Sequence, residues 1–559
     1  MEISIAYFSM EIGLEPAMPT YSGGLGVLAG DTLRSAADAG ISMAGITLLS
    51  RKGYFRQRLD DDGRQTEEPV HWPVVDYLSP TDARAVVEIE GRSVIVRAWR
   101  YDIQPCGADG RAVPVFLLDT DVEGNSDYDR TLTDFLYGGD DYYRLCQEVV
   151  LGIGGVRILR ALGCNSIERY HMNEGHSALL VLELLDEVSR ELDGAETSAE
   201  HIEQVRPMCV FTTHTPVDAG RDRFPLELAH RVLQTCGPFH SCADEFSYDG
   251  ELNLTHLALK NSYYINGVAK KHREISRKLF EGYHVDSITN GVHVCTWACD
   301  EMRALFDRYI PDWRNDNASL RYAISIDHEE IRQAHRKARH RLIEYVNKTC
   351  NVGMDDSVMT LGFARRVTEY KRTTLIFSDI ERLRSIARHC GPLQLVFAGK
   401  AHPRDIPGKG MIREIFRIMK EINSDIRVAY LSDYDMNIGR LMASGVDLWL
   451  NTPQPPMEAS GTSGMKAAIN GVPSLSVLDG WWIEGCIEGV TGWAIADPQL
   501  QRSGQAPEHE AEILYSKLEN IIVPLFYQSR DTWLEIMRHA IAINGSFFNT
   551  ERMLSLAST

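Results

Sequence analysis

The sequence predicts an α/β protein with two domains, each built around a parallel sheet of the Rossmann type. With 559 residues, the chain is too long for a single hydrophobic core. Near the N-terminus a strand, a glycine-rich turn, a helix and a second strand follow one another, and a second series of strands and helices begins near residue 359. Such alternation is typical of parallel sheets whose strands are joined by helices.

Composition and charge exclude several classes of function. The chain has 44% hydrophobic residues and a net charge of −20, so nucleic acid is not expected to be its main partner. No apolar run approaches the ~20 residues of a membrane span, and the first residues lack the basic region of a signal peptide. Eleven dispersed cysteines without a CxxC pair indicate reduced thiols and a cytoplasmic protein, and no metal site is expected.

The N-terminal segment predicts the opening of the first domain. Residues 3–8 have the pattern of a strand, residues 21–26 form a glycine turn, a helix follows to about residue 40, and residues 44–49 form a second strand. The glycines at 23 and 24 would let a phosphate group approach the backbone. Such a turn alone says little about function, because most glycine turns only redirect the chain.

Three further stretches complete the first domain. Short β-like runs within residues 54–110 predict an antiparallel addition, residues 113–118 another strand, and residues 142–162 a long helix. Residues 209–216 resemble a buried strand that ends in a polar turn containing His214. A lone histidine is more often structural than catalytic, but ligands bind at the carboxyl ends of strands in α/β sheets.

The second half predicts a connection and a second parallel sheet. Residues 296–354 are mostly helical and charged, as expected for a passage between domains. Apolar runs that predict strands then recur, with amphipathic helices between them, at residues 359–363, 394–398, 427–431, 446–450 and 474–478. The last ~35 residues have the pattern of two helical segments.

The stretch from residue 451 to 485 is the strongest candidate for chemistry. Prolines at 453, 455 and 456 end a strand, residues 458–464 are small and polar, and a helical pattern with Lys466 on its first turn follows. Backbone N–H groups at such a turn suit an anion. Lys466 would then contact a phosphate or form a Schiff base with a cofactor aldehyde. On these residues alone, a surface lysine is an equally good interpretation.

Residues 458–466, EASGTSGMK, resemble the pyridoxal-phosphate segment EASGTGNMK of the α-glucan phosphorylases, that is, glycogen, starch and maltodextrin phosphorylase. The match places the cofactor lysine of that family at Lys466. Further matches follow in the same order along most of the chain. Residues 21–29 resemble GNGGLGRLAA, 173–179 NDTHPAL, 253–258 NMAHL, 285–292 KTNGI, 365–372 KRIHEYKR and 433–435 ENYR.

The resemblance implies a role for each matched position. Lys466, Arg366, Lys371 and His214 are assigned to catalysis. The cofactor is expected to contact Lys466, Gly23, Gly24, Arg365, Tyr434, Gly461, Thr462 and Ser463. The substrates are expected to contact His214, Asn290, Glu458, Ser460, Gly461, Arg366 and Lys371, of which Arg366 and Lys371 bind the substrate phosphate. No metal is implied.

The chain departs from the family pattern at several of these positions. Residues 9–13, SMEIG, resemble the family's SLEFYMGR but end at Gly13 without its aromatic residue and its arginine, Thr368 replaces a histidine, and Asp435 stands where the family has an arginine. Glu174 replaces an aspartate. Each departure removes or moves a polar contact that the family has.

As a whole, the resemblance implies the GT-B fold, with two Rossmann-like doubly wound domains that face each other across a cleft. We expect an N-terminal domain at residues 1–300, a C-terminal domain on the pyridoxal-phosphate side at 301–525, and helices at 526–559 that cross back to the first domain. The compact chain is similar to the short bacterial and archaeal phosphorylases. No counterpart of the N-terminal regulatory extension of the animal enzymes is expected, and therefore little control by nucleotide or phosphorylation.

The implied activity is the reversible, retaining phosphorolysis of terminal α-1,4-glucosyl units of glycogen or maltodextrin with inorganic phosphate, giving glucose 1-phosphate. Pyridoxal 5′-phosphate would act through its own phosphate as an acid/base relay. A homodimer is compatible with the sequence.

Two alternatives stay open. A nucleotide-sugar-dependent glucan synthase has the same fold, but such enzymes lack the cofactor lysine, so Lys466 argues against this class. An inactive glucan-binding protein would be consistent with the departures at Gly13, Thr368 and Asp435.

Overall fold

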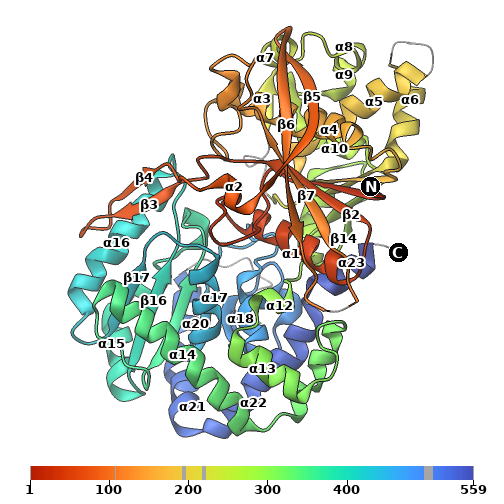
Figure 1. Cartoon of the computed structure of the whole chain (residues 1–559). Helices are drawn as coiled ribbons and strands as arrows, with labels where there is room; N and C mark the ends of the chain where they lie inside the picture. Colours follow the sequence, from red (N-terminus) through yellow and green to blue (C-terminus); the bar gives the residue numbers. More distant parts are fainter. Residues whose placement is uncertain (1, 108, 192–196, 217–221, 497–507, 558–559) are drawn as a thin grey trace. The chain divides into compact units, whose positions relative to one another are not determined.

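The computed structural model describes residues 2–107, 109–191, 197–216, 222–496 and 508–557 (Figure 1). The chain divides into two compact units. The first is Met1–Phe55 with Pro69–Ile288, and the second is Arg56–Glu68 with Thr289–Thr559. The predicted α/β fold class, with two Rossmann-like parts of the GT-B type, is confirmed in the sheet of each unit. The domain boundaries at 300 and 525 and the crossing of residues 526–559 stay predictions.

The first unit is organised around a sheet that has nine strands within the described residues, in the order β14-β13-β9-β8-β1-β2-β7-β6-β5. Their bounds are β1 Ile5–Phe8, β2 Met43–Leu48, β5 Ser79–Ile89, β6 Arg92–Ile103, β7 Val113–Asp119, β8 Arg169–Asn173, β9 Cys209–Thr212, β13 Tyr264–Gly267 and β14 Asp286–Ser287. Strands β5 and β6 are antiparallel additions, and the others run parallel. The order of the parallel strands reverses between β1 and β8, which is the switch point where Rossmann sheets bind ligands.

Helices and a small sheet surround this nine-stranded sheet. The helices are α1 Gly24–Asp38, α2 Val74–Tyr77, α3 Asp141–Val149, α4 Gly155–Ala161, α5 Leu180–Glu191, α6 Ala199–Val205, α7 Leu226–Val232, α8 Gly237–Ser241, α9 Ala243–Phe246, α10 Leu254–Lys260 and α11 Lys270–Leu279. The small antiparallel sheet consists of β10 Arg223–Pro225, β11 Ser247–Tyr248 and β12 Glu251–Asn253.

The long helix predicted at residues 142–162 is present but contains a π-helical turn, Val150–Gly154, between α3 and α4. Gly152 lies against the chain at the start of α5, where a Cβ atom would be 2.6 Å from the backbone nitrogen of Leu180. The close approach requires glycine, and the widened turn lies where the two segments meet.

The second unit contains a parallel sheet in the order β17-β16-β15-β18-β19-β20. Its strands are β15 Met359–Ala364, β16 Leu393–Ala398, β17 Arg427–Leu431, β18 Leu448–Asn451, β19 Ser474–Val477 and β20 Gly492–Ile495. In chain order this is the Rossmann arrangement 3-2-1-4-5-6, with its switch point between β15 and β18. Five of these strands were predicted from the sequence, and β20 was missed.

The second unit also contains helices that come before, between and after these strands in the sequence (Figure 1). They are α12 Val294–Trp297, α13 Asp300–Tyr309, α14 His328–Cys350, α15 Ile380–His389, α16 Ile406–Ile422, α17 Met436–Gly445, α18 Ser463–Ile469, α19 Trp482–Gly485, α20 Glu508–Lys517, α21 Val523–Gln528, α22 Arg530–His539 and α23 Thr550–Ala557. Among the C-terminal helices, α22 packs on α14, and the π-helical segment Ala540–Gly545 packs on α18.

A β-hairpin from the N-terminal half of the chain belongs to the second unit. It consists of β3 Arg56–Leu59 and β4 Gln65–Glu68, and it lies beside α16 (Figure 1). The side chain of Gln57 donates to the carbonyl oxygen of Gly399 at 3.0 Å, and Gln65 accepts from the backbone nitrogen of Ala401 at 3.1 Å. The sequence indicated β structure here but not the sheet that it joins.

Membrane-spanning helices, metal-binding groups and the state of the cysteines also bear on function. Among the described residues, no helix has the length and apolar character that crossing a membrane requires. In the same part of the chain, no three His, Cys, Asp or Glu side chains are grouped so that they could hold a metal ion. The expectation of reduced cysteines is wrong for Cys106 and Cys295, which are disulfide-bonded. It holds for the nine free thiols at Cys146, Cys164, Cys209, Cys236, Cys242, Cys299, Cys350, Cys390 and Cys486.

Candidate active site

In the second unit, the switch point of the sheet brings three predicted residues together. Arg365 follows the last residue of β15, Lys371 lies six residues further on, and Glu458 lies in the loop after β18. Arg365 Nη2 and Lys371 Nζ both contact Oε2 of Glu458, and all three side chains are at most 10% exposed. The ion-paired cluster is therefore largely removed from water.

The positive charges in this cluster stabilise the ionised form of Glu458. Burial alone would raise the pKa of Glu458, but the positive charges of Arg365 and Lys371 lower it to about 2. Glu458 is therefore a carboxylate at neutral pH, and it offsets part of the positive charge that an anion would otherwise meet.

Asp479 holds the loop that carries Glu458, and the sequence analysis missed it. Its carboxylate accepts hydrogen bonds from the backbone nitrogens of Glu458 and Gly480, both at 2.9 Å. Burial raises the pKa of Asp479 to about 6, although these two hydrogen bonds act in the opposite direction. The only signal in the sequence was an Asp-Gly pair just after a strand.

Several polar atoms near Glu458 lack a hydrogen-bond partner among the described residues. They are Nε and Nη1 of Arg365 and Oγ of Ser460, and all three atoms are buried. Buried donors are rarely left unsatisfied, so these atoms indicate where a ligand with acceptor oxygens would bind. Gly461 has φ +81°, which favours glycine, and a Cβ atom there would lie 3.2 Å from Cδ of Glu458.

Lys466 lies beside the aromatic side chain of Trp297 in the same unit. Its Nζ is 3.8 Å from the centroid of the Trp297 ring, and the Lys466 residue is 7% exposed. A Cβ atom on Gly439 would lie 2.8 Å from Tyr434 Oη and 3.6 Å from the Trp297 ring, so Gly439 leaves room for both. Burial raises the pKa of Tyr434, while nearby Arg365 acts to lower it. Trp297 was not among the predicted residues.

The remaining predicted residues of the second unit are Arg366, Asn290, Thr462 and Ser463. Arg366 is exposed, unlike its neighbour Arg365. Asn290 is 5% exposed, and its carbonyl oxygen accepts from Arg552 at 3.3 Å. Thr462 precedes α18 without a side-chain capping bond, and Ser463 Oγ accepts from Trp449 Nε1 at 3.2 Å.

In the first unit, Glu11 organises the glycine turn. Its carboxylate accepts from the backbone nitrogens of Ser22 and Gly23, the latter at 3.1 Å, and from the Tyr137 hydroxyl at 2.9 Å. The turn leads into α1, whose first N–H groups have no partner within the helix. Apart from the adjacent residues and the backbone of α1 itself, no described atom lies within 4 Å of a Cβ built on Gly23 or Gly24. The glycines therefore leave open space above the helix N-terminus, where a ligand phosphate would fit.

His214 follows β9 in the first unit, near the switch point between β1 and β8. Burial lowers its pKa to about 3, so the ring is neutral at physiological pH. His214 Nε2 is 2.6 Å from Asn173 Oδ1, an acceptor, so the hydrogen is assigned to Nε2. Glu174 accepts from the backbone nitrogen of His214 at 2.8 Å, although its own φ of +75° is unusual for a residue with a side chain. Glu174 therefore fixes the turn that carries His214.

Two of the departures from the family pattern, Asp435 and Gly13, have a local explanation. Asp435 caps α17, since its carboxylate accepts from the backbone nitrogen of Ile438 at 2.8 Å. Gly13 lies against α1, where a Cβ atom on Gly13 would be 3.3 Å from both the Gly26 carbonyl oxygen and Val27 Cα. Nothing in the structure explains Thr368.

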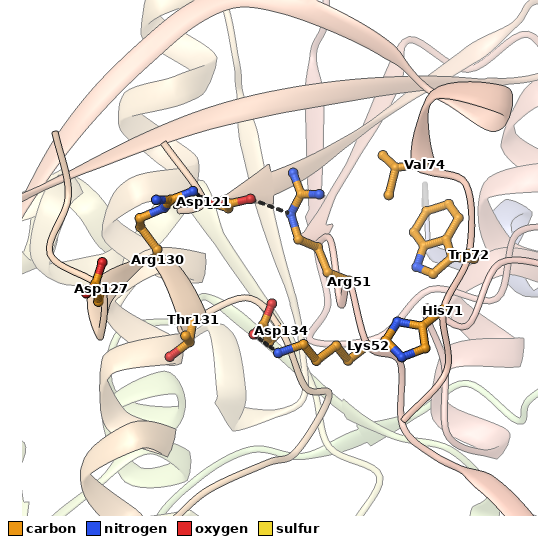
Figure 2. Close-up of a pocket in the computed structure, with 10 residues that line it drawn as sticks. All are labelled: Arg51, Lys52, His71, Trp72, Val74, Asp121, Asp127, Arg130, Thr131 and Asp134. Carbon is orange, nitrogen blue, oxygen red and sulfur yellow. Dashed lines mark hydrogen bonds and ion pairs between the residues drawn. The ribbon is translucent and has the colours of Figure 1, made fainter. Parts of the chain in front are cut away.

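A cavity of about 470 Å³ in the first unit is separate from these residues (Figure 2). Trp72 and several charged side chains line it, and its arginine and lysine side chains form ion pairs with aspartates. Arg51 lies 3.7 Å from Asp121, and Lys52 lies 2.7 Å from Asp134. None of the predicted site residues lines this cavity within the described ranges.

Known proteins resemble the chain over nearly its whole length. The family model described as carbohydrate phosphorylase matches residues 242–490. The chain is 38% identical to the maltodextrin phosphorylase of Thermococcus litoralis over 99% of its own length and 70% of that protein. It is 35% identical to the glycogen phosphorylase of Aquifex aeolicus (98% and 84%) and 36% identical to that of Mycobacterium tuberculosis (98% and 69%). The chain therefore belongs to the carbohydrate phosphorylase family.

Proposed function

We propose that this protein is an α-1,4-glucan phosphorylase that carries pyridoxal 5′-phosphate on Lys466. It would cleave terminal glucosyl units of glycogen or maltodextrin with inorganic phosphate, reversibly and with retention, to give glucose 1-phosphate. The names of its relatives, maltodextrin phosphorylase and glycogen phosphorylase, support this activity.

The observation that carries the proposal is the surroundings of Lys466. A buried amine lies 3.8 Å from the Trp297 ring, and Tyr434 lies close to the same ring. Arg365 offers two buried donor atoms that lack partners among the described residues. A primary amine, aromatic walls and spare guanidinium hydrogens suit a planar aldehyde that bears a phosphate. The residues present therefore fit the cofactor.

The chain's own residues would act by binding and charge. Lys466 would hold the cofactor covalently, and Arg365 would bind the cofactor phosphate. Lys371 and Arg366 would bind the substrate phosphate, in competition with Glu458 for Lys371. The bound cofactor would supply a phosphate group that relays a proton to the substrate phosphate. His214, Asn290, Glu458, Ser460 and Gly461 would hold the sugar.

The remaining positions would support these groups. Gly23 and Gly24 would leave the space that a phosphate needs near α1. Thr462, Ser463 and Tyr434 would line the cofactor side. Neutral His214, which donates its Nε2 hydrogen to Asn173, would accept from a sugar hydroxyl through Nδ1 without adding charge. We further propose a cytoplasmic protein that acts as a homodimer and binds neither nucleic acid nor membrane.

The first experiment is an absorbance spectrum of the purified protein before and after borohydride reduction, followed by peptide mapping. We expect a reducible chromophore trapped on Lys466, and glucose 1-phosphate release from maltodextrin and phosphate. Lys466→Arg, which keeps the charge, serves as the control and should be colourless and inactive. A protein that stays colourless after incubation with pyridoxal phosphate would contradict the proposal, and nucleotide-sugar transfer and glucan binding would then be tested.

A further inference from the structure

A second cavity lies in the second unit, between α14 and α22. Its volume is about 260 Å³, which is slightly smaller than the usual range for small-molecule sites. Arginines and aromatic side chains line it, among them Arg336 and Arg339 of α14, Arg530 at the start of α22, and Trp533. The mechanism proposed above uses none of these residues.

The lining carries an excess of positive charge. Four arginines face the cavity against two aspartates, Asp356 and Asp447, in a protein whose net charge is −20. Within the described residues, neither Arg336 nor Arg530 takes part in a hydrogen bond or an ion pair, and both are exposed. The guanidinium groups at the mouth of the cavity are therefore available to an anion.

The wall of the cavity contains two buried polar atoms that lack partners among the described residues. They are Nδ1 of His335 and Nε of Arg339. His335 and Arg339 are 6% and 9% exposed, and both contact Asp447 Oδ1 through their other nitrogens, at 3.0 and 3.2 Å. Asp447 thus fixes both side chains and leaves one nitrogen of each unsatisfied. In native proteins such atoms usually meet a ligand or an ordered water.

The cavity is distinct from the candidate active site. Asp447 immediately precedes β18, and its Oδ2 accepts from the backbone nitrogen of Thr360 at the start of β15 at 2.9 Å. Arg365 follows the opposite end of β15. Five residue steps along a strand span ~17 Å, so the cavity lies at the amino edge of the sheet and Arg365 at the carboxyl edge.

We propose that this cavity binds the phosphate group of a small phosphate compound, either inorganic phosphate or a sugar phosphate. Arg336 and Arg530 would bind the phosphate oxygens from the exposed side, and Arg339 would donate its Nε hydrogen from the buried wall. The apolar faces of Trp533 and Phe526 would contact the rest of a sugar phosphate. A bound ligand would join α14 to α22 and so hold the C-terminal helices to the core of the second unit. This inference is independent of the proposed catalytic activity, because its test measures binding.

The test is calorimetric titration of glucose 6-phosphate, inorganic phosphate and glucose into the full-length protein. The titrations use the Lys371→Met background, which weakens phosphate binding at the candidate active site. We expect both phosphate compounds to bind, glucose not to bind, and Arg336→Gln/Arg530→Gln to weaken binding roughly 10- to 100-fold. Lys337→Gln, which removes one charge from the neighbouring position of α14, should leave the affinity unchanged.

Both arginines are exposed and unpaired within the described residues, so their replacement should preserve the fold, as circular dichroism would verify. Tighter binding of glucose 6-phosphate than of inorganic phosphate would identify a sugar-phosphate site, and equal binding a site for the phosphate group alone. Equal affinity of the double variant and the parent, or a Kd above about 1 mM in the parent, would overturn the proposal.

Discussion

Lys371 and Glu458 form a buried ion pair, with Lys371 Nζ in contact with Glu458 Oε2 and both side chains at most 10% exposed. In the proposed reaction a phosphate ion must share or take over this lysine. The carboxylate therefore acts as an internal competitor for the substrate anion, and the strength of phosphate binding depends on it.

Glu458→Gln tests this competition. The substitution keeps the shape of the side chain and removes its charge, so we expect the KM for phosphate to fall by roughly 5- to 10-fold, since one charged contact is worth about 1–1.5 kcal/mol. We expect kcat to fall as well, because Glu458 is proposed to hold the sugar. Steady-state kinetics with varied phosphate measure both. Lys371→Gln should change the KM in the opposite direction, and a higher KM in Glu458→Gln would refute the competition.

Asp479→Asn should change the pH dependence of stability. The pKa of Asp479 is about 6 in the folded protein against an ordinary value of 3.8, so the folded state binds the proton more tightly than the unfolded state. Its contribution to stability is therefore full below pH 3.8 and is lost as pH rises to 6, by up to about 3 kcal/mol. We expect the melting temperature of Asp479→Asn to fall less than that of the parent between pH 4 and 6, as calorimetry would measure. Identical slopes would show that Asp479 does not titrate in this range.

Gly24→Ala and Gly30→Ala form a matched pair on α1. Apart from the adjacent residues and the backbone of α1 itself, a Cβ atom on Gly24 meets no described atom within 4 Å, so the folded protein should be as stable as the parent or more stable by about 0.4–1 kcal/mol. The same methyl group would occupy the space proposed for phosphate, and we expect activity to fall at least ~10-fold. On Gly30 the methyl group would lie 2.0 Å from the Gly13 carbonyl oxygen and should destabilise the protein by about 1–3 kcal/mol. Thermal denaturation and activity assays separate the two effects, and a destabilised but fully active Gly24→Ala protein would contradict this assignment.

Trp297→Leu should weaken cofactor binding more than Trp297→Phe. Phenylalanine keeps an aromatic face beside the Lys466 nitrogen that would hold the cofactor, whereas leucine removes this face. The interaction of an aromatic face with a cationic nitrogen is worth about 0.5–2 kcal/mol. We expect Trp297→Leu to lose pyridoxal phosphate on dialysis several-fold faster, as followed by the absorbance of the retained chromophore. Equal retention by both variants would mean that the ring only fills space.

The sequence predicted the sheets well where strands are long or strongly apolar, as at residues 113–118 and 394–398. It missed β20, whose four residues Gly492–Ile495 include glycine and alanine and give no clear pattern. It also missed the destination of residues 56–68, because Gln57 and Gln65 pair with Gly399 and Ala401, which only the folded chain brings near. Local patterns contain no information about pairings of this kind.

In the candidate site, too, some residues were predicted from the sequence and others were found only in the structure. Family resemblance identified Lys371, Glu458 and Lys466, and the roles proposed for these residues stay predictions. It did not indicate Trp297 or Asp479, which act through their packing and through the backbone they hold. Such roles depend on three-dimensional neighbours, and the residue types alone are compatible with an ordinary core tryptophan or a turn aspartate.

The hairpin of β3 and β4 has a consequence for the synthesis of the protein. Its Gln57 pairs with Gly399, 342 residues later in the chain. At a translation rate of ~5–20 residues per second, the ribosome needs roughly 17–70 s to add that much chain after the hairpin emerges. During this interval the hairpin has no partner from the second unit, so a chaperone or neighbouring nascent chain would find its strand edges open. A fragment that begins at residue 289 would lack the hairpin altogether, and Gly399 and Ala401 would lose the glutamine partners that complete their hydrogen bonding.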